Sequence, residues 1–333
     1  MKLQFKHQPF QAEAADAVCD VFCGQPYRTV TYRRDLGDLT GVQISTYDTE
    51  VGFRNQPLVP ELTNRRLLDN LRAVQRRNGL KPSDELTGPG VNLSIEMETG
   101  TGKTYTYVKT MYELNKRYGW SKFIIVVPSV AIREGVYKSL QTTQEHFAGE
   151  YNKKIRFFIY NSDRLTEVDR FASDSAINVM IINMQAFNSS KNQRIIDKKL
   201  DTFRSRKPID IIAKTNPILI IDEPQSVDNS KQAKAAIKSL NPLFVLRYSA
   251  THKQAYNMIY RLTPVDAFER HLVKGICVDS IKAEANLNGA YVRLESVKSD
   301  PFSAKVSIDV RQADGTQKRK AVTVKTGNDL YQK

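Results

Sequence analysis

A glycine-rich segment carries the strongest chemical signal in the sequence. The residues Met97-Glu-Thr-Gly-Thr-Gly-Lys-Thr104 lie between an apolar run that predicts a strand and a pattern that predicts a helix. Gly100 and Gly102 allow backbone N–H groups to approach phosphate oxygens, and the start of a helix adds positive potential. Lys103 can reach the β- and γ-phosphates of a nucleotide, and Thr104 offers a hydroxyl ligand to Mg²⁺. The segment therefore predicts a phosphate-binding loop.

The match covers the end of the usual G-x-x-x-x-G-K-[ST] pattern, because Met97 stands where the first glycine is expected. The alternative is an incidental glycine turn, but this string rarely follows a predicted strand by chance. We assign nucleotide binding to Thr99, Gly100, Thr101, Gly102, Lys103 and Thr104.

Two acidic residues end a second apolar run, in Pro217-Ile-Leu-Ile-Ile-Asp-Glu-Pro-Gln225. Asp222, at the tip of the predicted strand, can hold phosphate-bound Mg²⁺ through water. Glu223 can orient and deprotonate the water that attacks a phosphate. Taken alone, such a pair more often marks a strand that leaves the core. The phosphate-binding loop elsewhere in the chain favours the catalytic interpretation.

The elements that must position these residues form an alternating pattern. From residue 91 to about residue 260, nearly continuous apolar runs alternate with helical patterns, which predicts an α/β domain on a parallel sheet buried on both faces. The glycine loop, the acidic pair and Arg247-Tyr-Ser-Ala-Thr251 each follow the carboxyl end of a predicted strand. The predicted strands are Val91–Ile95, Phe123–Val127, Ile155–Ile159, Val179–Ile182, Ile218–Ile221 and Leu243–Tyr248.

The rest of the chain differs in pattern. A helix is predicted over residues 8–24, whereas residues 25–90 look irregular apart from a basic helix near Asn64 to Asn78. Residues 290–326 alternate polar and apolar side chains around Asp314-Gly315, which predicts an antiparallel hairpin. We therefore expect an N-terminal extension (1–90), the α/β domain (91–275) and a small β-rich element (276–333).

Composition and charge narrow the class of protein. The chain of 333 residues is 41% hydrophobic and 26% charged, as in ordinary folded domains. Fifty Lys and Arg against 36 Asp and Glu give a net charge of +14, which favours a polyanionic partner such as nucleic acid. Basic clusters at residues 64–82 and 191–214 fit this interpretation, although charge runs are more often solvated faces.

Membrane insertion, secretion and zinc binding are disfavoured. The apolar runs are far shorter than the roughly 20 residues that cross a bilayer. The N-terminus turns polar before a signal-peptide core could form, so we expect a cytoplasmic protein. The three cysteines predict reduced thiols, mostly packed in the core. The four histidines are scattered along the sequence, so no zinc site is expected.

In their order along the chain, T-G-T-G-K-T, D-E-P-Q and S-A-T resemble motifs of the first motor domain of superfamily 2 helicases and translocases. The resemblance implies a RecA-like P-loop NTPase fold that uses ATP and Mg²⁺. It covers most of residues 1–24 and 91–276, and further details make it similar to the restriction (Res) subunit of type III restriction-modification systems. These details are Glu98–Tyr105, the proline of Asp222-Glu-Pro-Gln225, Pro264–Glu269, Leu272–Ile276 and Gly327–Tyr331.

The resemblance also implies roles for individual residues. Gln11 stands where superfamily 2 proteins read adenine, although it could instead be a surface residue of a helix. Gln225 stands where many relatives carry histidine, and it can still bridge toward Thr251 or a γ-phosphate. Strand-end loops of this kind can contact DNA phosphates, or merely cap the elements that follow them. DNA contact is implied for Pro128, Ser129, Arg133, Asn183, Met184 and Gln185, coupling for Ser249 and Thr251, catalysis for Lys103, Glu223 and Gln225, and metal binding for Thr104 and Asp222.

By this resemblance the chain is the motor portion of a type III restriction endonuclease, an ATP-dependent DNA translocase or helicase. Its implied partners are DNA and a modification (methyltransferase) subunit. No Q-x-x-G-R-x-x-R element of a second motor domain follows residue 252, and the acids and lysine of a nuclease domain are not found. We therefore expect the N-terminal part of a larger motor, nearly inactive in isolation. The alternatives are a non-catalytic module that docks DNA or a subunit, and a small NTPase such as a kinase, which the S-A-T segment disfavours.

Overall fold

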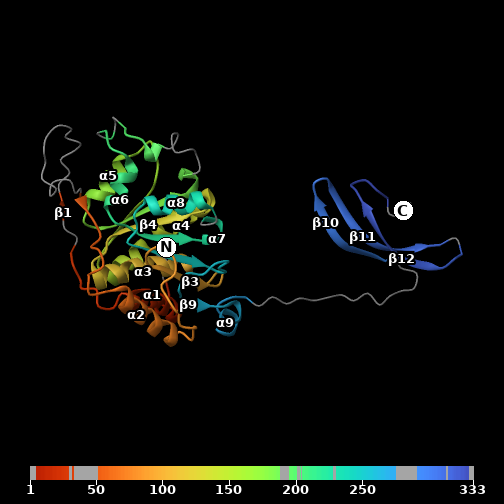
Figure 1. The fold of residues 1–333 in the computed structure, drawn as a ribbon, viewed down its shortest axis with the longest axis horizontal. Coiled ribbons are helices and arrows are strands. Elements are labelled where there is room, and N and C mark those ends of the chain that lie inside the picture. The colour runs from red at the N-terminus through yellow and green to blue at the C-terminus, as the bar shows by residue number, and fades with distance from the viewer. Residues whose placement is uncertain are drawn as a thin grey trace. The chain divides into compact units, whose positions relative to one another are not determined.

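The computed structural model describes residues 5–29, 32–33, 52–187, 195–200, 203, 205–227, 230–274, 291–312 and 314–329. Its contacts divide the chain into two compact units, Met1–Gly275 and Ile276–Lys333. The first holds a large parallel sheet with helices and the second a small antiparallel sheet (Figure 1). Cys277, Leu330, Tyr331 and part of the basic cluster at 191–214 lie outside the described residues.

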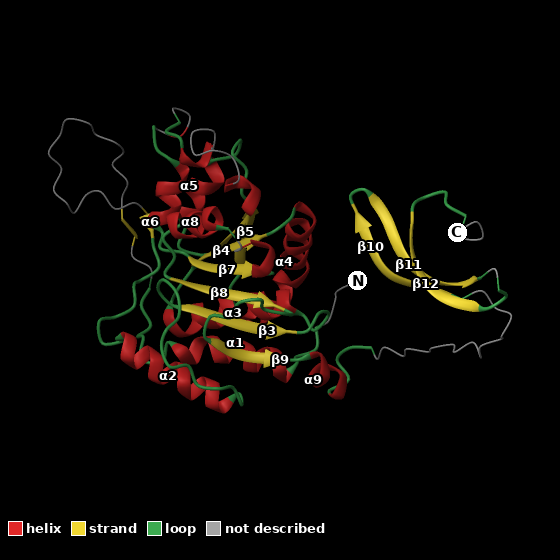
Figure 2. Cartoon of the chain, turned by 45° about the vertical axis from the view of Figure 1, so that its right-hand side comes forward, coloured by secondary structure: helices red, strands yellow, loops and turns green. Residues whose placement is uncertain are grey.

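A seven-stranded sheet forms the centre of the first unit (Figure 2). Its strands follow the spatial order β5-β6-β4-β7-β8-β3-β9, and every neighbouring pair is parallel. This arrangement confirms the predicted α/β fold, and all of the predicted strands are present with small shifts at their ends. They are β3 (Asn92–Met97), β4 (Lys122–Val127), β5 (Ile155–Ile159), β6 (Ile177–Asn183), β7 (Ile218–Asp222) and β8 (Phe244–Ser249).

The edge strand β9 (Met258–Leu262) was not predicted. It has 5 residues and pairs in parallel with β3. Its side chains are of mixed character, because Arg261 is exposed and forms an ion pair of 3.0 Å with Glu96 of β3. So short and mixed a run cannot be told from a loop by its pattern alone.

Helices cover both faces of the sheet. Successive side chains of a strand point to opposite faces, so Ile125 of β4 belongs to the core cluster that includes residues of α1 to α4, while Ile124 belongs to the cluster that includes residues of α5, α6 and α8. Among the described helices, none combines the length and the apolar character needed to cross a bilayer. The helices are α1 (Pro9–Val21), α2 (Asn64–Arg77), α3 (Lys103–Tyr118), α4 (Val130–Tyr151), α5 (Thr166–Ser173), α6 (Pro208–Lys214), α7 (Pro224–Val227), α8 (Lys231–Ser239) and α9 (Pro264–Glu269).

The N-terminal extension packs into the same core as the sheet. Helix α1 begins with a proline in its first turn, where a missing N–H costs nothing, and it lies along α3. Arg117 of α3 forms ion pairs with Asp16 and Asp20 of α1. Helix α2 is capped by the Thr63 hydroxyl and contributes Leu67 to the core. Short strands β1 (Tyr32–Arg33) and β2 (Gly52–Phe53) pair with each other in this extension.

Asn55 shows how the irregular segment before α2 is held. Its side chain is fully buried. Its Oδ1 accepts hydrogen bonds from the backbone N–H groups of Ser121 and Lys122, at 2.8 and 3.0 Å. Its Nδ2 donates to the carbonyls of Lys122 and Asn216, at 2.8 and 3.1 Å. One amide thus satisfies backbone groups at the beginnings of β4 and β7.

The second unit is a three-stranded antiparallel sheet in the order β10-β11-β12. The strands are β10 (Val292–Ser299), β11 (Phe302–Arg311) and β12 (Gln317–Val324). The predicted hairpin is confirmed, since β11 pairs with β12 across the turn that holds Asp314 and Gly315. Gly315 has a φ of +83°, and the Asp314 carboxylate accepts a hydrogen bond from the Thr316 hydroxyl at 2.6 Å.

Candidate nucleotide-binding site

The glycine loop turns the chain from the end of β3 into the start of α3. Gly100 and Gly102 have φ values of +82° and +90°, which residues with a side chain rarely adopt. A Cβ atom at Gly102 would lie 2.5 Å from Nε2 of Gln11, so a side chain there would also force Gln11 to shift. The first N–H groups of a helix have no partner within it, so those of α3 can donate to phosphate oxygens.

Gln11 of α1 anchors this loop from the side. Its side chain is buried, and Nε2 donates a hydrogen bond of 3.0 Å to the carbonyl of Thr101. Thr101 is buried as well, and its hydroxyl donates to the carbonyl of Glu98 at 2.6 Å. The alternative that Gln11 is a surface residue is therefore wrong. Its adenine contact remains a prediction.

Lys103 and Glu223 form an ion pair beyond the carboxyl ends of the sheet strands. Strand β8 lies between β3 and β7, and the segments that follow these strands converge at one edge of the sheet. The Nζ of Lys103 lies 2.7 Å from Oε1 of Glu223, and the two side chains are 12% and 24% exposed. Glu223 has a φ of +53°, an unfavourable value for a residue with a side chain. Its backbone N–H is held by the carbonyl of Tyr248 at 3.0 Å.

The second oxygen of Glu223 joins a hydrogen-bond network. Oε2 accepts from Nε2 of Gln225 at 2.6 Å and lies 2.9 Å from the Ser249 hydroxyl. That hydroxyl is also 2.9 Å from Oε1 of Gln225 and 2.8 Å from the carbonyl of Thr251, with one hydrogen to donate among them. Burial alone would raise the pKa of Glu223, but the hydrogen bonds from Lys103, Gln225 and Ser249 outweigh it and hold the pKa below its ordinary value. Glu223 is therefore ionised at neutral pH.

Asp222 is the last residue of β7 and is buried. Burial, assisted by the neighbouring Glu223 carboxylate, raises the pKa of Asp222 to about 6. A buried carboxylate of this kind is stabilised by a bound cation. Together with the Thr104 hydroxyl it offers the oxygen ligands that Mg²⁺ prefers, so these residues fit the metal that the glycine loop implies.

Sequence reasoning missed Tyr107 of α3. This residue is fully buried, and its hydroxyl lies close enough to Asp222 and Thr104 for both to shift its pKa. Burial, with the Asp222 charge added to it, raises the pKa of Tyr107 well above its ordinary value. The signal was available, because a residue four positions after Lys103 lies on the same face of the helix.

The first set of predicted DNA contacts lies where β4 meets α4. Pro128 and Ser129 follow the strand and are half-buried. The Ser129 hydroxyl caps α4 by accepting a hydrogen bond from the N–H of Ile132 at 3.3 Å. Arg133 is partly exposed and pairs with Glu134 at 2.8 Å. The capping alternative thus describes the Ser129 hydroxyl in this structure.

The second set lies beside the first, because Asn183 at the end of β6 is paired in register with Val127 of β4. The Asn183 side chain is buried, and its Oδ1 accepts from the N–H of Gln185 at 3.0 Å. Met184 is buried in the core, whereas Gln185 is exposed. Of these three residues, the structure leaves Gln185 at the surface.

The basic cluster of α2 is partly used inside the molecule. Arg72 donates to the carbonyls of Ser83 and Asp84 at 2.8 and 2.9 Å. Arg77 forms an ion pair of 2.6 Å with Asp20 of α1. Arg65 and Arg76 are exposed. Charge counting along the sequence therefore overstates what α2 can offer to a polyanion.

Comparison with known proteins places these motifs in a family. Residues 68–254, more than half of the chain, match the family model described as "Type III restriction enzyme, res subunit". The chain is 32% identical over 291 residues to the type III restriction-modification enzyme EcoP15I Res subunit of Escherichia coli, covering 81% of this chain and 28% of that protein. It is 33% identical over 235 residues to the EcoPI Res subunit of Escherichia phage P1, covering 65% and 24%. The chain spans about a quarter of the length of these two relatives.

Among solved structures, the Sulfolobus solfataricus SWI2/SNF2 ATPase core in complex with dsDNA is similar over 57% of this chain and 32% of that chain. The identity is 15% and the TM-score is 0.32.

Proposed function

Because the chain belongs to the family of type III restriction enzyme Res subunits, we propose that its first unit binds Mg-ATP and acts as part of a motor on DNA. The ion pair of 2.7 Å between Lys103 and Glu223 supports this most directly. It brings the phosphate-binding lysine and the candidate general base to one point. That point lies outside the carboxyl ends of the strands, where open α/β sheets bind ligands.

The same ion pair suggests how nucleotide binding frees Glu223 to act as the general base. Phosphate oxygens entering the glycine loop draw Lys103 away from Oε1 of Glu223. Oε2 keeps its contacts with Gln225 and Ser249, so the carboxylate stays in place. Oε1 is then the oxygen that accepts a proton from the attacking water.

Asp222 and Thr104 would hold Mg²⁺, and the bound ion would supply positive charge to the phosphate oxygens. The cost of ionising the buried Asp222 is offset when a cation is close. Gln11 uses Nε2 to hold the loop, so its Oε1 would accept a hydrogen bond from the adenine amino group. The Gln11 side chain would therefore both bind adenine and hold the glycine loop.

Coupling to DNA would run through Ser249. Thr251 is exposed, and its backbone N–H donates to the Ser249 hydroxyl at 3.2 Å. A DNA strand that moves Thr251 would shift Ser249 and so change the contacts of Glu223. The net charge of +14 favours such a partner, and at this edge Gln185 is exposed and Arg133 is partly exposed.

For the whole protein we propose ATP-driven translocation on DNA, endonuclease activity elsewhere in the polypeptide, and a modification (methyltransferase) subunit as partner. The support is the identity of 32% to 33% with Res subunits of type III restriction-modification enzymes. A module used only for docking would not need a strained glutamate paired with a phosphate-loop lysine. The described site therefore favours catalysis over docking.

Replacing Lys103 tests nucleotide binding directly. Lys103→Ala should abolish measurable Mg-ATP binding in isothermal titration calorimetry, because the main positive charge at the phosphates is removed. Lys116→Ala is the matched control, since Lys116 is an exposed lysine further along the same helix and should leave affinity unchanged. Equal ATP affinity in the two variants would refute the site.

A further inference from the structure

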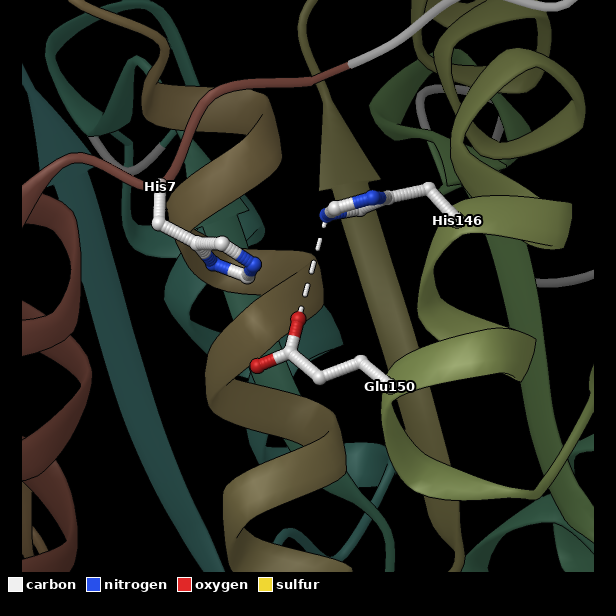
Figure 3. Close-up of side chains that lie close together, drawn as sticks. All are labelled: His7, His146 and Glu150. Atoms are coloured by element: carbon white, nitrogen blue, oxygen red, sulfur yellow. Dashed lines mark ion pairs between the residues drawn. The ribbon is translucent and has the colours of Figure 1, made fainter.

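Two histidines that are distant in the sequence meet beside α4. Among the residues that the structure describes, His7, His146 and Glu150 form a group of potential metal ligands whose donor atoms all lie within 4.8 Å of one another. Figure 3 shows the three side chains turned toward a common space. His7 belongs to the segment that leads into α1, whereas His146 and Glu150 belong to α4. The four histidines are scattered along the sequence, but the fold brings two of them together.

The two α4 residues are spaced as metal ligands on a helix often are. Positions i and i+4 lie on the same face, and Nε2 of His146 is 3.8 Å from Oε2 of Glu150. Both side chains are partly shielded, at 15% and 25% exposed. Partial burial limits competition from solvent while leaving room for an ion to enter.

Neighbouring residues hold these ligands in place. Nζ of Lys109 binds Oε1 of Glu150 at 2.7 Å, and Oε2 is the oxygen that approaches His146. The Tyr105 hydroxyl lies 2.8 Å from Nε2 of His146. The Phe5 ring packs 5.2 Å from the His146 ring, measured between centroids. The contacts of Lys109 and Phe5 orient the ligands and reduce the ordering needed on binding, whereas the Tyr105 hydroxyl occupies the ring nitrogen that would bind the ion.

We propose that His7, His146 and Glu150 bind one divalent transition-metal ion of the Zn²⁺ class. Two imidazoles and one carboxylate, with water in the fourth position, form a donor set typical of zinc and poorly suited to Mg²⁺ or Ca²⁺. Tetrahedral coordination brings ligand atoms to about 3.3 Å from one another, given zinc bonds of about 2.0 to 2.1 Å. Side-chain rotation is enough to close the remaining distance, because His7 is exposed.

Two neighbours oppose the ion. The Tyr105 hydroxyl must release Nε2 of His146, and the Lys109 charge repels a cation. The side chains of Tyr105 and Lys109 can both turn away from the ion. The ligands themselves come from a short N-terminal segment and one helix. A bound ion would fasten residues 5–8 to α4, close in the chain to Gln11, whose side chain holds the glycine loop. The proposal stands apart from the proposed ATPase function, because none of its ligands belongs to the predicted nucleotide site.

Metal titration of the full chain tests the site. Protein treated with EDTA should bind one equivalent of Zn²⁺ in calorimetry, and Co²⁺ should give a visible absorption band at the same stoichiometry. His7→Ala, His146→Ala and Glu150→Gln should each weaken binding at least tenfold. His271→Ala is the matched control, because it removes an exposed histidine outside the cluster and should leave affinity unchanged.

Two further measurements separate a built site from unspecific binding. Tyr105→Phe should tighten Zn²⁺ binding severalfold, since it removes the competitor for His146. Hydrogen exchange at residues 5–8 should slow on addition of Zn²⁺ in the wild type and not in His146→Ala. The proposal is overturned if the wild type shows no saturable binding, if His7→Ala binds as tightly as His271→Ala, or if Tyr105→Phe binds more weakly. Cys23 carries an exposed free thiol, so binding lost in Cys23→Ser and kept in His7→Ala would overturn the proposal and assign the ion to that thiol.

Discussion

At the scale of single residues, the nucleotide site is organised around the Glu223 carboxylate. Lys103 contacts one oxygen, while Gln225 and Ser249 contact the other. The positive φ of Glu223 costs about 1 to 3 kcal/mol, and such strain persists where surrounding contacts hold it. The arrangement keeps a partly buried base ionised and aimed at the glycine loop.

Glu223→Gln separates this role from nucleotide binding. The amide keeps the size of the side chain and loses the charge and the ability to accept a proton. In the full-length protein, steady-state ATPase activity should fall by roughly 10² to 10⁴, whereas Mg-ATP affinity should change little. Glu145→Gln, at an exposed glutamate of α4, serves as control and should retain activity. Unchanged phosphate release in Glu223→Gln would remove the assignment as general base.

At the scale of elements, buried polar side chains outside the site hold the strands that carry it. Asn55 satisfies backbone groups before β4 and β7, and Lys122 joins β4 to the end of α5. The Nζ of Lys122 donates to the carbonyls of Phe171, at 2.6 Å, and of Asp174. Hydrogen bonds from an irregular segment and from a buried lysine therefore satisfy backbone groups that the regular helices and strands leave without partners.

Asn55→Ala should destabilise the first unit by about 2 to 4 kcal/mol, because it leaves several buried backbone groups without partners. Urea unfolding followed by circular dichroism measures the change. Asn64→Ala removes an exposed asparagine at the start of α2 and should stay within about 0.5 kcal/mol of the wild type. An equal, small effect in both variants would contradict the role given to Asn55.

Lys122 should make stability depend on pH. Burial lowers the pKa of Lys122 from 10.5 to about 7, so between these values the unfolded chain holds a proton that the folded chain has lost. The free energy of unfolding contributed by this group therefore rises with pH, by up to about 1.4 kcal/mol per unit. Urea titrations at pH 7.5 and 9.5 should show this gain in the wild type relative to Lys122→Met. Parallel pH profiles for the two proteins would contradict the lowered pKa of Lys122.

At the scale of the whole molecule, the proposed motor function implies a further contribution to the nucleotide site. Superfamily 2 motors deliver arginines to the γ-phosphate from a second motor domain, and no Q-x-x-G-R-x-x-R string follows residue 252. An absent arginine finger costs roughly 10³ to 10⁵ in rate. We therefore predict that full activity needs such arginines in addition to the residues of the described site.

Residues 1–333, purified alone, should bind Mg-ATP and release phosphate more slowly than about 1 s⁻¹, with or without DNA. A coupled phosphate-release assay measures this, with the Lys103→Ala form of the same chain as background. Faster turnover that Lys103→Ala abolishes would show that an arginine from these residues, or from a second copy, completes the site.

The sequence by itself determined the glycine loop, the acidic pair and the strands that precede them. These features are local. A buried parallel strand appears as a continuous apolar run such as Phe123–Val127, and a phosphate-binding loop needs glycines at fixed offsets before a helix. Such patterns need no knowledge of which strands become neighbours.

Tertiary structure alone decided which residues meet. The pairing of Lys103 with Glu223 depends on β8 lying between β3 and β7, and the burial of Met184 depends on how the turn after β6 packs. Strand β9 exists because β3 offers it an edge. His7 approaches His146 only because α1 packs along α3 and brings its leading segment toward α4. Each of these contacts joins residues distant in the chain, so its energy depends on the order of strands and helices and leaves no local pattern in the sequence.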